Sequence, residues 1–229
     1  LGGAPNCDTP VLADARALAD ALLMRELRHT NGWRAGDVAA ARARWRAESD
    51  AERPGVAPLC EVLRAALPED TMIYSDMTQF ACVANEVWPM AHPGHWHHPS
   101  GFGTLGYALP AAIGGAVARR GKPTIAIAGD YGFQYTVQEL GTAVELGLPL
   151  PILLWDNGKL KEIEDSMVRA QIAPNAVIAH NPDFCALARA YGAYAEAPQT
   201  HRALQDAVRA ALVADRPTLI HMTSALGAG

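Results

Sequence analysis

The sequence predicts an α/β protein: a doubly wound parallel sheet with helices on both faces, preceded by a helical amino-terminal tail. Three observations support this. Short apolar runs alternate with amphipathic helical patterns from Pro54 onward, no repeat or low-complexity tract interrupts them, and half of the 229 residues are hydrophobic. Near-continuous apolar runs are typical of parallel strands that are covered on both faces. The apolar content is enough for a sizeable core.

Two helices are expected before the sheet. Apolar residues at helical spacing predict the first over Val11–Arg28, with Asp8 or Thr9 as its cap. The second, Asp37–Ala51, is rich in Ala, Arg and Glu and has few large apolar residues, which is typical of a solvated linker helix. The break at residues 52–55 (ERPG) then leads into the main domain.

Five strands and five helices are expected in that domain. The expected strands are Thr71–Ser75, Thr124–Ala128, Pro151–Trp155, Ala193–Glu196 and Thr218–Met222. The expected helices are Ala57–Ala66, Gly106–Arg119, Thr136–Leu146, Pro182–Tyr191 and His201–Ala214. Ligands bind beyond the carboxyl ends of strands in such sheets, so a site is expected just after Ser75, Ala128 and Trp155.

Charge and cysteine content argue against several kinds of protein. The net charge is -5 and there is no basic stripe, so neither nucleic acid nor a membrane surface is an expected partner. The four cysteines are far apart and lack metal-binding or dithiol spacing, as expected of reduced thiols. No apolar run approaches the roughly 20 residues that span a bilayer, and residues 1–10 do not resemble a signal peptide. We therefore expect a soluble, cytoplasmic protein.

A metal site is expected where two strands end. The strand Thr124–Ala128 leads into residues 129–132 (GDYG), whose backbone N–H groups can face a phosphate. Asp130 would repel a bare phosphate, but Mg²⁺ resolves this because it bridges protein oxygens to phosphates. Asn157 lies 27 positions later (157 minus 130), which accommodates one right-handed crossover. Both strand ends can then face one ion.

These residues resemble the thiamine-diphosphate (ThDP) motif of the acetolactate-synthase-like family, which includes pyruvate and benzoylformate decarboxylases. The resemblance covers roughly residues 54–222 and implies Mg²⁺ held against the cofactor diphosphate. It implies these metal ligands: Asp130, Asn157 and the carbonyl of Lys159. It implies these further cofactor contacts: Gly129, Tyr131, Gly132 and, from the segment SDMTQ, Gln79.

Upstream, residues 101–114 (GFGTLGYALPAAIG) resemble the family segment that receives the aminopyrimidine ring. The resemblance implies that the Gly103 carbonyl accepts from the 4'-amino group and that the Leu105 N–H bonds a ring nitrogen. It also makes Leu105 the apolar wedge that bends the cofactor, which brings reacting groups close together. Thr104, between them, belongs to the same set.

The sequence departs from the family pattern at two positions. Tyr131 replaces a glycine or small residue, which affects how closely the backbone approaches phosphate. Asp156 replaces the usual asparagine and adds a charge near the metal. The run GDYGFQYTVQELGTAVELGLPLPILLW resembles the 5-guanidino-2-oxopentanoate decarboxylase branch of the family.

The resemblance divides the chain into the tail of a central domain (1–30), a linker helix (31–53) and the ThDP diphosphate-binding domain (54–229). It implies a homodimer or homotetramer in which a partner subunit's pyrimidine-binding domain supplies the activating glutamate. No stretch here resembles that domain, so no catalytic residue is expected in this chain. Because the chain also begins with Leu1 rather than Met, we expect a carboxy-terminal fragment that is inactive by itself.

The predicted function is ThDP- and Mg²⁺-dependent decarboxylation of a small 2-oxo acid, by a decarboxylase or an acetolactate-type carboligase. Glu162 is the candidate for pairing with a guanidinium tail, because carboxylates bind that group in a two-pronged way. The alternative for Glu162, Glu164 and Asp165 is a solvated acidic helix face. Two other functions stay open: a nicotinamide-dependent oxidoreductase, which lacks its G-x-G-x-x-G motif here, and a non-catalytic assembly module.

Each motif also has a simpler structural interpretation. Asp130 is also suited to capping a helix, and Asn157 to a turn with Gly158. The glycines around Leu105 would also permit tight packing, and Gln79 would also suit a solvent-facing position. The histidines of the segment HPGHWHH lack nearby cysteine or carboxylate ligands, so pocket lining is favoured over zinc binding: His92, His95, His97 and His98.

Overall fold

The computed structural model divides the chain into two units, residues 1–42 and 43–229. It describes residues 9–25, 32, 34–178 and 180–228. In the first unit, α1 (Ala15–Leu23) begins after Asp14, whose side chain accepts hydrogen bonds from two backbone N–H groups of the first turn. The cap is therefore Asp14 and not Thr9. Asp8 and the expected helix end at Arg28 lie outside the described residues.

Helix α2 (Ala35–Glu52) confirms the predicted second helix and has one buried residue, Ser49. Its carboxyl-terminal half belongs to the second unit and is held there by polar contacts. The Ser49 hydroxyl donates to Glu86 at 3.0 Å, and the Arg46 guanidinium pairs with Glu61 at 2.6 Å. The few apolar side chains of this helix explain why polar groups make its contacts.

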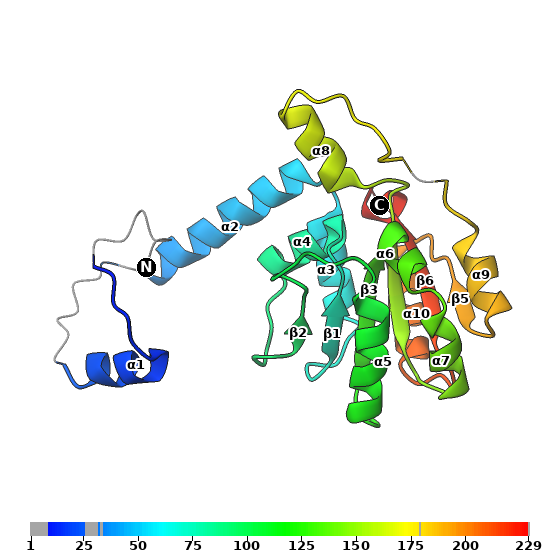
Figure 1. The fold of residues 1–229 in the computed structure, drawn as a ribbon, viewed down its shortest axis with the longest axis horizontal. Coiled ribbons are helices and arrows are strands. Elements are labelled where there is room, and N and C mark those ends of the chain that lie inside the picture. The colour runs from blue at the N-terminus through cyan, green and yellow to red at the C-terminus, as the bar shows by residue number, and fades with distance from the viewer. Residues whose placement is uncertain (1–8, 26–31, 33, 179, 229) are drawn as a thin grey trace. The chain divides into compact units, whose positions relative to one another are not determined.

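The second unit is built on a six-stranded sheet in which every strand pair is parallel (Figure 1). The strand order is β2-β1-β3-β4-β6-β5. The strands are β1 (Met72–Ser75), β2 (Trp96–His97), β3 (Thr124–Gly129), β4 (Pro151–Asp156), β5 (Tyr194–Glu196) and β6 (Thr218–Thr223). The predicted parallel sheet is thus confirmed, and β2 is an additional short strand.

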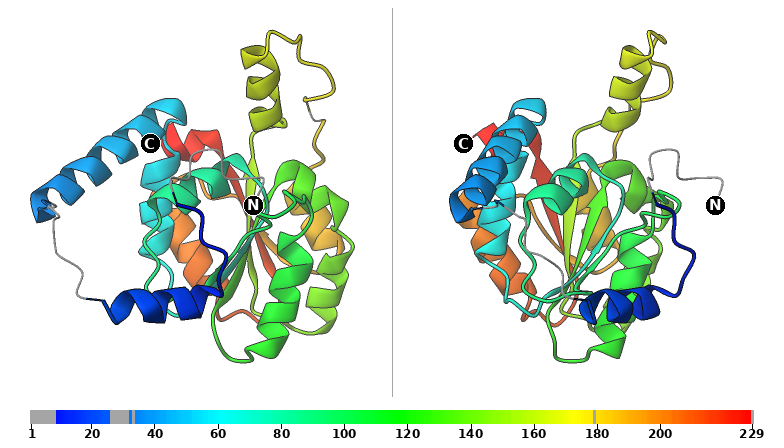
Figure 2. Two further views of the ribbon diagram at one scale, coloured as in Figure 1. Left: turned by 60° about the vertical axis from the view of Figure 1, so that its left-hand side comes forward. Right: turned by 90° about the vertical axis from the view of Figure 1, so that its left-hand side faces the viewer.

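Helices cover both faces of the sheet, as the two views in Figure 2 show. One hydrophobic cluster joins the sheet to α3 (Val56–Arg64), α4 (Gln79–Val87) and α10 (His201–Ala211). The other joins it to α5 (Ala108–Ala118), α7 (Glu139–Glu145) and α9 (Phe184–Ala190). The remaining elements are α6 (Asp130–Tyr135), α8 (Lys161–Arg169) and the 3₁₀ helix η1 (Ser224–Ala228).

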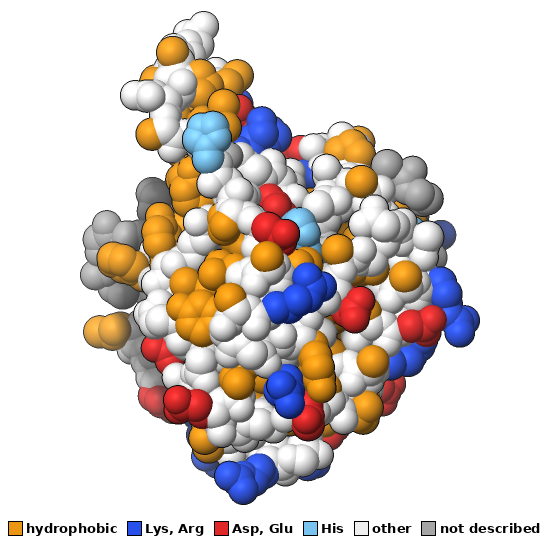
Figure 3. Space-filling model, turned by 90° about the vertical axis from the view of Figure 1, so that its right-hand side faces the viewer, with side chains coloured by type: hydrophobic (Ala, Val, Ile, Leu, Met, Phe, Trp, Pro, Cys, Tyr) orange, Lys and Arg blue, Asp and Glu red, His pale blue; other side chains and the backbone are white. Residues whose placement is uncertain are grey.

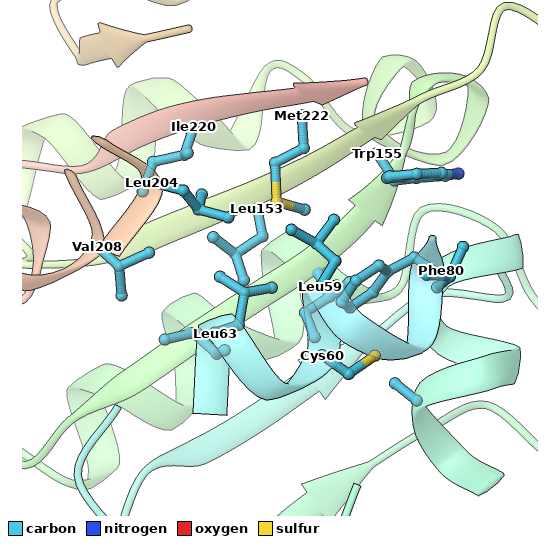
Figure 4. Packing of buried hydrophobic residues seen from close by; sticks show 14 of the residues in the cluster. Leu59, Cys60, Leu63, Phe80, Leu153, Trp155, Leu204, Val208, Ile220 and Met222 are labelled. Atoms are coloured by element: carbon cyan, nitrogen blue, oxygen red, sulfur yellow. The ribbon is translucent and has the colours of Figure 1, made fainter. Parts of the chain in front are cut away.

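The first cluster is centred on the middle strands (Figure 4). Leu153 of β4 points toward Leu59 and Leu63 of α3, and all three side chains are fully buried. Burying one such side chain stabilises the fold by about 1.5–3 kcal/mol relative to exposing it. Gly55, just before α3, lies against the backbone of Gly227 and has a φ of +83°, so a side chain at this position has no room.

Two helices differ from the prediction. The expected helix Thr136–Leu146 is replaced by α6 and α7, so a helix begins directly at Asp130. Helix α4 was not predicted, although Thr78 caps it by accepting a hydrogen bond from the N–H of Ala81 at 3.0 Å. A threonine cap without Glu or Gln three residues later, where this chain has Ala81, is a weak sequence signal.

Two findings concern the possibility of a membrane-spanning helix and the state of the cysteines. In the described part of the chain, no helix combines the length and apolar character that crossing a membrane requires. The cysteines that the structure describes, Cys60, Cys82 and Cys185, are free thiols. Burial raises the pKa of Cys60 to about 12, so this thiol is unreactive near neutral pH.

Candidate functional site

The site lies at the carboxyl ends of β3 and β4, which are adjacent strands of the sheet. Gly129 at the end of β3 is in register with Trp155 of β4. The residues that follow, Asp130 and Asp156-Asn157, therefore leave the sheet side by side. Figure 1 shows the two helices that follow these strands, α6 and α8, at this same end of the sheet.

Asp130 is the first residue of α6, and its side chain is in a buried, polar setting. Oδ1 accepts a hydrogen bond from the N–H of Tyr131 at 2.9 Å, and Oδ2 accepts one from Nδ2 of Asn181 at 2.8 Å. Burial raises the pKa of the Asp130 carboxyl and the nearby Asp156 carboxylate adds to this, while the two hydrogen bonds oppose it. A buried carboxylate of this kind is stabilised in its charged form by a cation.

Asp156, the last residue of β4, has the opposite balance. Its Oδ1 accepts from the Gly158 N–H at 3.0 Å and from Asn181 Nδ2 at 2.9 Å, and its Oδ2 lies 2.9 Å from Nε2 of His221. Burial alone would raise the pKa of Asp156, but the hydrogen bonds from His221, Gly158 and Asn181 outweigh it and lower this pKa. The extra carboxylate of the motif is thus stabilised by the protein itself.

Asn157 is oriented by Gln79, the first residue of α4. The Oε1 of Gln79 accepts hydrogen bonds from Nδ2 of Asn157 and from the indole Nε1 of Trp155, each at 3.3 Å. The Oδ1 of Asn157 accepts from the N–H of Lys159 at 3.3 Å. An amide oxygen has two acceptor positions, so Oδ1 has the capacity to bind a cation as well. Gln79 faces the site, not the solvent.

The simpler interpretation holds for Asn157 but not for Asp130. Gly158 has a φ of +69°, as a turn after Asn157 requires, whereas the cap of α6 is Gly129, and Asp130 is the first helical residue and accepts from the adjacent Tyr131 N–H. These local contacts use only part of the acceptor capacity of each side chain. They therefore hold the side chains in place without preventing metal binding.

Asp76 joins the aminopyrimidine segment to the end of β1. Its two carboxylate oxygens accept from the N–H of Gly106 at 3.1 Å and the N–H of Ala108 at 2.8 Å. Burial raises its pKa, against these hydrogen bonds. Gly132 of α6 packs against the Asp76 carboxylate so closely that a Cβ would collide with it. One aspartate thus connects three segments of the predicted site.

The residues that are predicted to receive the aminopyrimidine ring lie in the loop before α5. Gly103 has a φ of +69°, which favours glycine, and faces the Met77 side chain. Leu105 is half-buried and Thr104 is exposed. The carbonyl of Gly106 accepts from the Thr136 hydroxyl at 3.2 Å, which holds this loop beside the end of α6.

The acidic residues of α8 are all paired with cations. Both Glu162 oxygens bind the Arg53 guanidinium, at 3.1 Å each, from Nε and Nη2. Glu164 pairs with Lys159 at 2.8 Å, and Asp165 pairs with Lys161. Glu162 thus binds a guanidinium in a two-pronged way, but that group is the side chain of Arg53. The predicted pairing with a substrate tail stays a prediction.

Among the described residues, no three His, Cys, Asp or Glu side chains form a metal cluster by themselves. The ring centroids of His92 and His95 lie 5.1 Å apart, and the other two histidines of this segment contact other residues. His97 stacks on Tyr74 with ring centroids 4.8 Å apart, and the Ser75 hydroxyl is 2.9 Å from Nδ1 of His98. Mg²⁺ does not need a protein cluster, because it uses one or two side-chain oxygens together with phosphates and water. Asp130 and Asn157 offer that set of oxygens.

The sequence pattern of one family, described as "Thiamine pyrophosphate enzyme, C-terminal TPP binding domain", matches residues 76–222. The match includes both strand ends and the aminopyrimidine segment. The chain belongs to this family of ThDP enzymes. The match favours ThDP over a nicotinamide dinucleotide as the cofactor.

Individual relatives agree with the family. The chain is 41% identical over 217 residues to "Probable 2-ketoarginine decarboxylase AruI" of Pseudomonas aeruginosa, covering 93% of this chain and 38% of that protein. It is 32% identical over 185 residues to the acetolactate synthase isozyme 2 large subunit of Escherichia coli, covering 78% of this chain and 33% of that protein. Because 2-ketoarginine is 5-guanidino-2-oxopentanoate, the predicted similarity to that branch is confirmed.

A solved structure supports the fold. The ThDP-dependent 4-hydroxybenzoylformate decarboxylase of Rhodococcus jostii RHA1 matches with a TM-score of 0.69 and 27% identity, over 75% of this chain and 32% of that one. The chain thus spans roughly a third of the length of the proteins it matches.

Sequence reasoning missed three residues of the site: Asp76, Asn181 and His221. Asp76 had a usable signal, because it follows β1 as Asp130 follows β3. His221 had a weaker one, as a polar residue within the apolar strand β6. Asn181 lies in an irregular segment between α8 and α9 and had no signal in the sequence.

Proposed function

We propose that the chain is the diphosphate- and Mg²⁺-binding part of an enzyme that decarboxylates a 2-oxo acid with ThDP. The observation that carries the proposal is the pairing of two strand ends that offer oxygen ligands, Asp130 and Asn157, next to each other. The carbonyl of Lys159 would be the third protein ligand. When bound, ThDP supplies the carbanion-stabilising chemistry, and the protein binds and orients it.

The neighbouring residues have matching roles in this proposal. Gly129, Tyr131 and Gly132 would approach the diphosphate at the start of α6, and Gln79 would hold Asn157 in its binding orientation. The Gly103 carbonyl and Leu105 would receive the aminopyrimidine ring, with Thr104 between them. Asp76 supports this arrangement, because it fixes the loop through Gly106 and Ala108.

We propose a guanidino 2-oxo acid as the substrate, on the basis of similarity to the 2-ketoarginine decarboxylase. Glu162 would bind the guanidinium tail. Since Arg53 already occupies both carboxylate oxygens, the tail has to exchange with the Arg53 guanidinium. The Arg53 side chain is 15% exposed and that of Glu162 is 35% exposed, so the approach is from the Glu162 side.

The proposed partner is the pyrimidine-binding domain of another subunit in a homodimer or homotetramer. Helix α8 has no buried residue. Figure 3 shows hydrophobic side chains over the projection that α8 forms with the segment after it. The exposed apolar side chains there are Ile163, Val168, Ile172 and Ile178. An exposed apolar group of this kind is typical of a surface that another domain covers.

Calorimetric titration of the intact protein with ThDP tests the cofactor. We expect binding with Mg²⁺ present, no binding after EDTA treatment, and no binding of NAD. Binding of NAD in place of ThDP would support the oxidoreductase. The non-catalytic module predicts no binding of either cofactor and no release of carbon dioxide from any 2-oxo acid.

Steady-state kinetics test the substrate. Glu162→Gln should raise KM for 5-guanidino-2-oxopentanoate by about tenfold or more, because a charge-assisted pair is lost, and leave KM for pyruvate nearly unchanged. Arg53→Ala frees the carboxylate and should lower KM for the guanidino substrate. Equal effects of Glu162→Gln on both substrates would argue against a role in recognition.

A further inference from the structure

The amide of Asn181 bridges the carboxylates at the two strand ends. Its Nδ2 lies 2.8 Å from Oδ2 of Asp130 and 2.9 Å from Oδ1 of Asp156. An asparagine amide nitrogen carries two hydrogens, so each carboxylate receives one. Asn181 lies in the segment before α9, and its amide contacts both strand ends.

The orientation of the Asn181 amide is fixed by Gln134. The Nε2 of Gln134 donates to Oδ1 of Asn181 at 3.2 Å and to the carbonyl of Asp130 at 3.1 Å. Because the oxygen of Asn181 accepts from Gln134, its nitrogen must face the two carboxylates. Gln134 is on the same short helix as Asp130, so α6 holds both one of the two carboxylates and the group that orients the Asn181 amide.

The bridge compensates for the repulsion between the two neighbouring carboxylates. Asp156 is a carboxylate where the family motif usually has a neutral asparagine, and it lies close enough to Asp130 to repel it. Asn181 donates to both carboxylates, and His221 binds the other oxygen of Asp156. Each carboxylate oxygen has further acceptor capacity, so Asp130 remains able to bind a cation.

We propose that Asn181 is a positioning residue for the Mg²⁺ site: it holds the Asp130 carboxylate in its metal-binding orientation and keeps Asp156 turned toward His221. The proposal rests on the proposed function, since it assigns a role toward the same ion. Groups that hydrogen-bond metal ligands orient them and increase metal affinity. A different role, in which the amide fills the place of the ion and must leave, predicts the opposite effect of removing it.

The test is a Mg²⁺ titration of the intact protein at saturating ThDP, followed by calorimetry. Asn181→Ala should weaken Mg²⁺ binding by about 10- to 100-fold, the usual cost of removing such a partner. The affinity for ThDP at saturating Mg²⁺ and the Tm of the ligand-free protein should change little. A general folding defect would instead lower both. Asn175→Ala, the same substitution at an exposed position, is the matched control and should bind Mg²⁺ as the wild type does.

Gln134→Ala gives a second test that leaves Asn181 in place. It should weaken Mg²⁺ binding less than Asn181→Ala, and the double variant should be no weaker than Asn181→Ala, because Gln134 acts through Asn181. Unchanged or tighter Mg²⁺ binding by Asn181→Ala, or additive losses of affinity in the double variant, would overturn this inference and leave the proposed function standing. A wild type that binds no ThDP with Mg²⁺ would overturn the proposed function and this inference together.

Discussion

The ends of β3 and β4 present two aspartates in adjacent positions with opposite electrostatic settings. Burial raises the pKa of Asp130 at the end of β3. At the end of β4, the hydrogen bonds to Asp156 outweigh burial and lower its pKa. Among the contacts that lower the pKa of Asp156, the hydrogen bond from His221 is the largest contributor, and Asp130 has no such partner in the described part of the chain. One carboxylate is thus satisfied by the protein, while the other is left with a need for positive charge.

This difference supports the proposed roles, in which Asp130 serves a ligand and Asp156 serves the fold. A buried carboxylate whose charge is incompletely compensated costs stability, and proteins retain such groups mainly where they have a function. Asp130 fits this description and Asp156 does not. The two residues have the same type and nearly the same place in the sheet, so only their contacts distinguish them.

The largest expected effect is on cofactor binding. Asp130→Ala should weaken Mg²⁺-dependent ThDP binding by more than about a hundredfold. The proposed metal ligand is then lost outright, and removing even a group that hydrogen-bonds such a ligand costs about tenfold or more. Asp156→Ala should have a smaller effect. Calorimetry with ThDP at fixed Mg²⁺ measures both. A larger loss for Asp156→Ala would reverse the roles assigned to the two aspartates.

The glycines after the two strands should also respond differently. Gly132→Ala places a Cβ onto the Asp76 carboxylate and should lower the free energy of unfolding by about 1–3 kcal/mol. In Gly158→Ala the new Cβ has no neighbouring atom within 4 Å. This substitution should lower the free energy of unfolding by about 1 kcal/mol, because a φ of +69° is unfavourable for alanine. Urea denaturation of the ligand-free variants gives both values. Equal costs would mean that the packing around Gly132 relaxes easily.

The smallest expected effect concerns pH. The lowered pKa of Asp156 contributes stability that is present above its ordinary pKa of 3.8 and is lost as pH falls through the lowered value. His221→Phe removes the main hydrogen bond and should reduce the free energy of unfolding by about 1 kcal/mol at neutral pH. This difference should shrink as the pH falls through the lowered pKa.

Carboxyl NMR titration of the ligand-free protein checks the same point directly. Asp130 should titrate above its ordinary pKa and Asp156 below it, and His221→Phe should raise the value for Asp156. Similar pKa values for the two aspartates in the wild type would contradict the comparison.

Much of the fold could be predicted because its signals are local. The apolar runs of β3, β4 and β6 are buried on both faces and appear at the expected positions. The strand Trp96–His97 was missed because two residues carry no periodicity. The sequence pattern does not predict a helix that begins at Asp130, because Gly129 and Gly132 favour a turn there.

The site could be predicted only in part, for a similar reason. Asp130 and Asn157 follow strands with clear apolar patterns, so the parallel topology alone brings them to the same end of the sheet. Asn181 reaches the same place through an irregular segment, and Arg53 meets Glu162 from 109 positions away. Such contacts depend on packing across the fold, which sequence spacing does not encode. The roles of these residues toward the cofactor stay predictions.

The hydrogen bond between Trp155 and Gln79 gives this site a built-in optical reporter. The indole of Trp155 is 97% buried and donates to the same oxygen that orients Asn157. A movement of Asn157 that breaks its hydrogen bond to Gln79 would therefore change the surroundings of that indole. Among the five tryptophans of the chain, the emission of this one would follow occupancy of the site without an added dye.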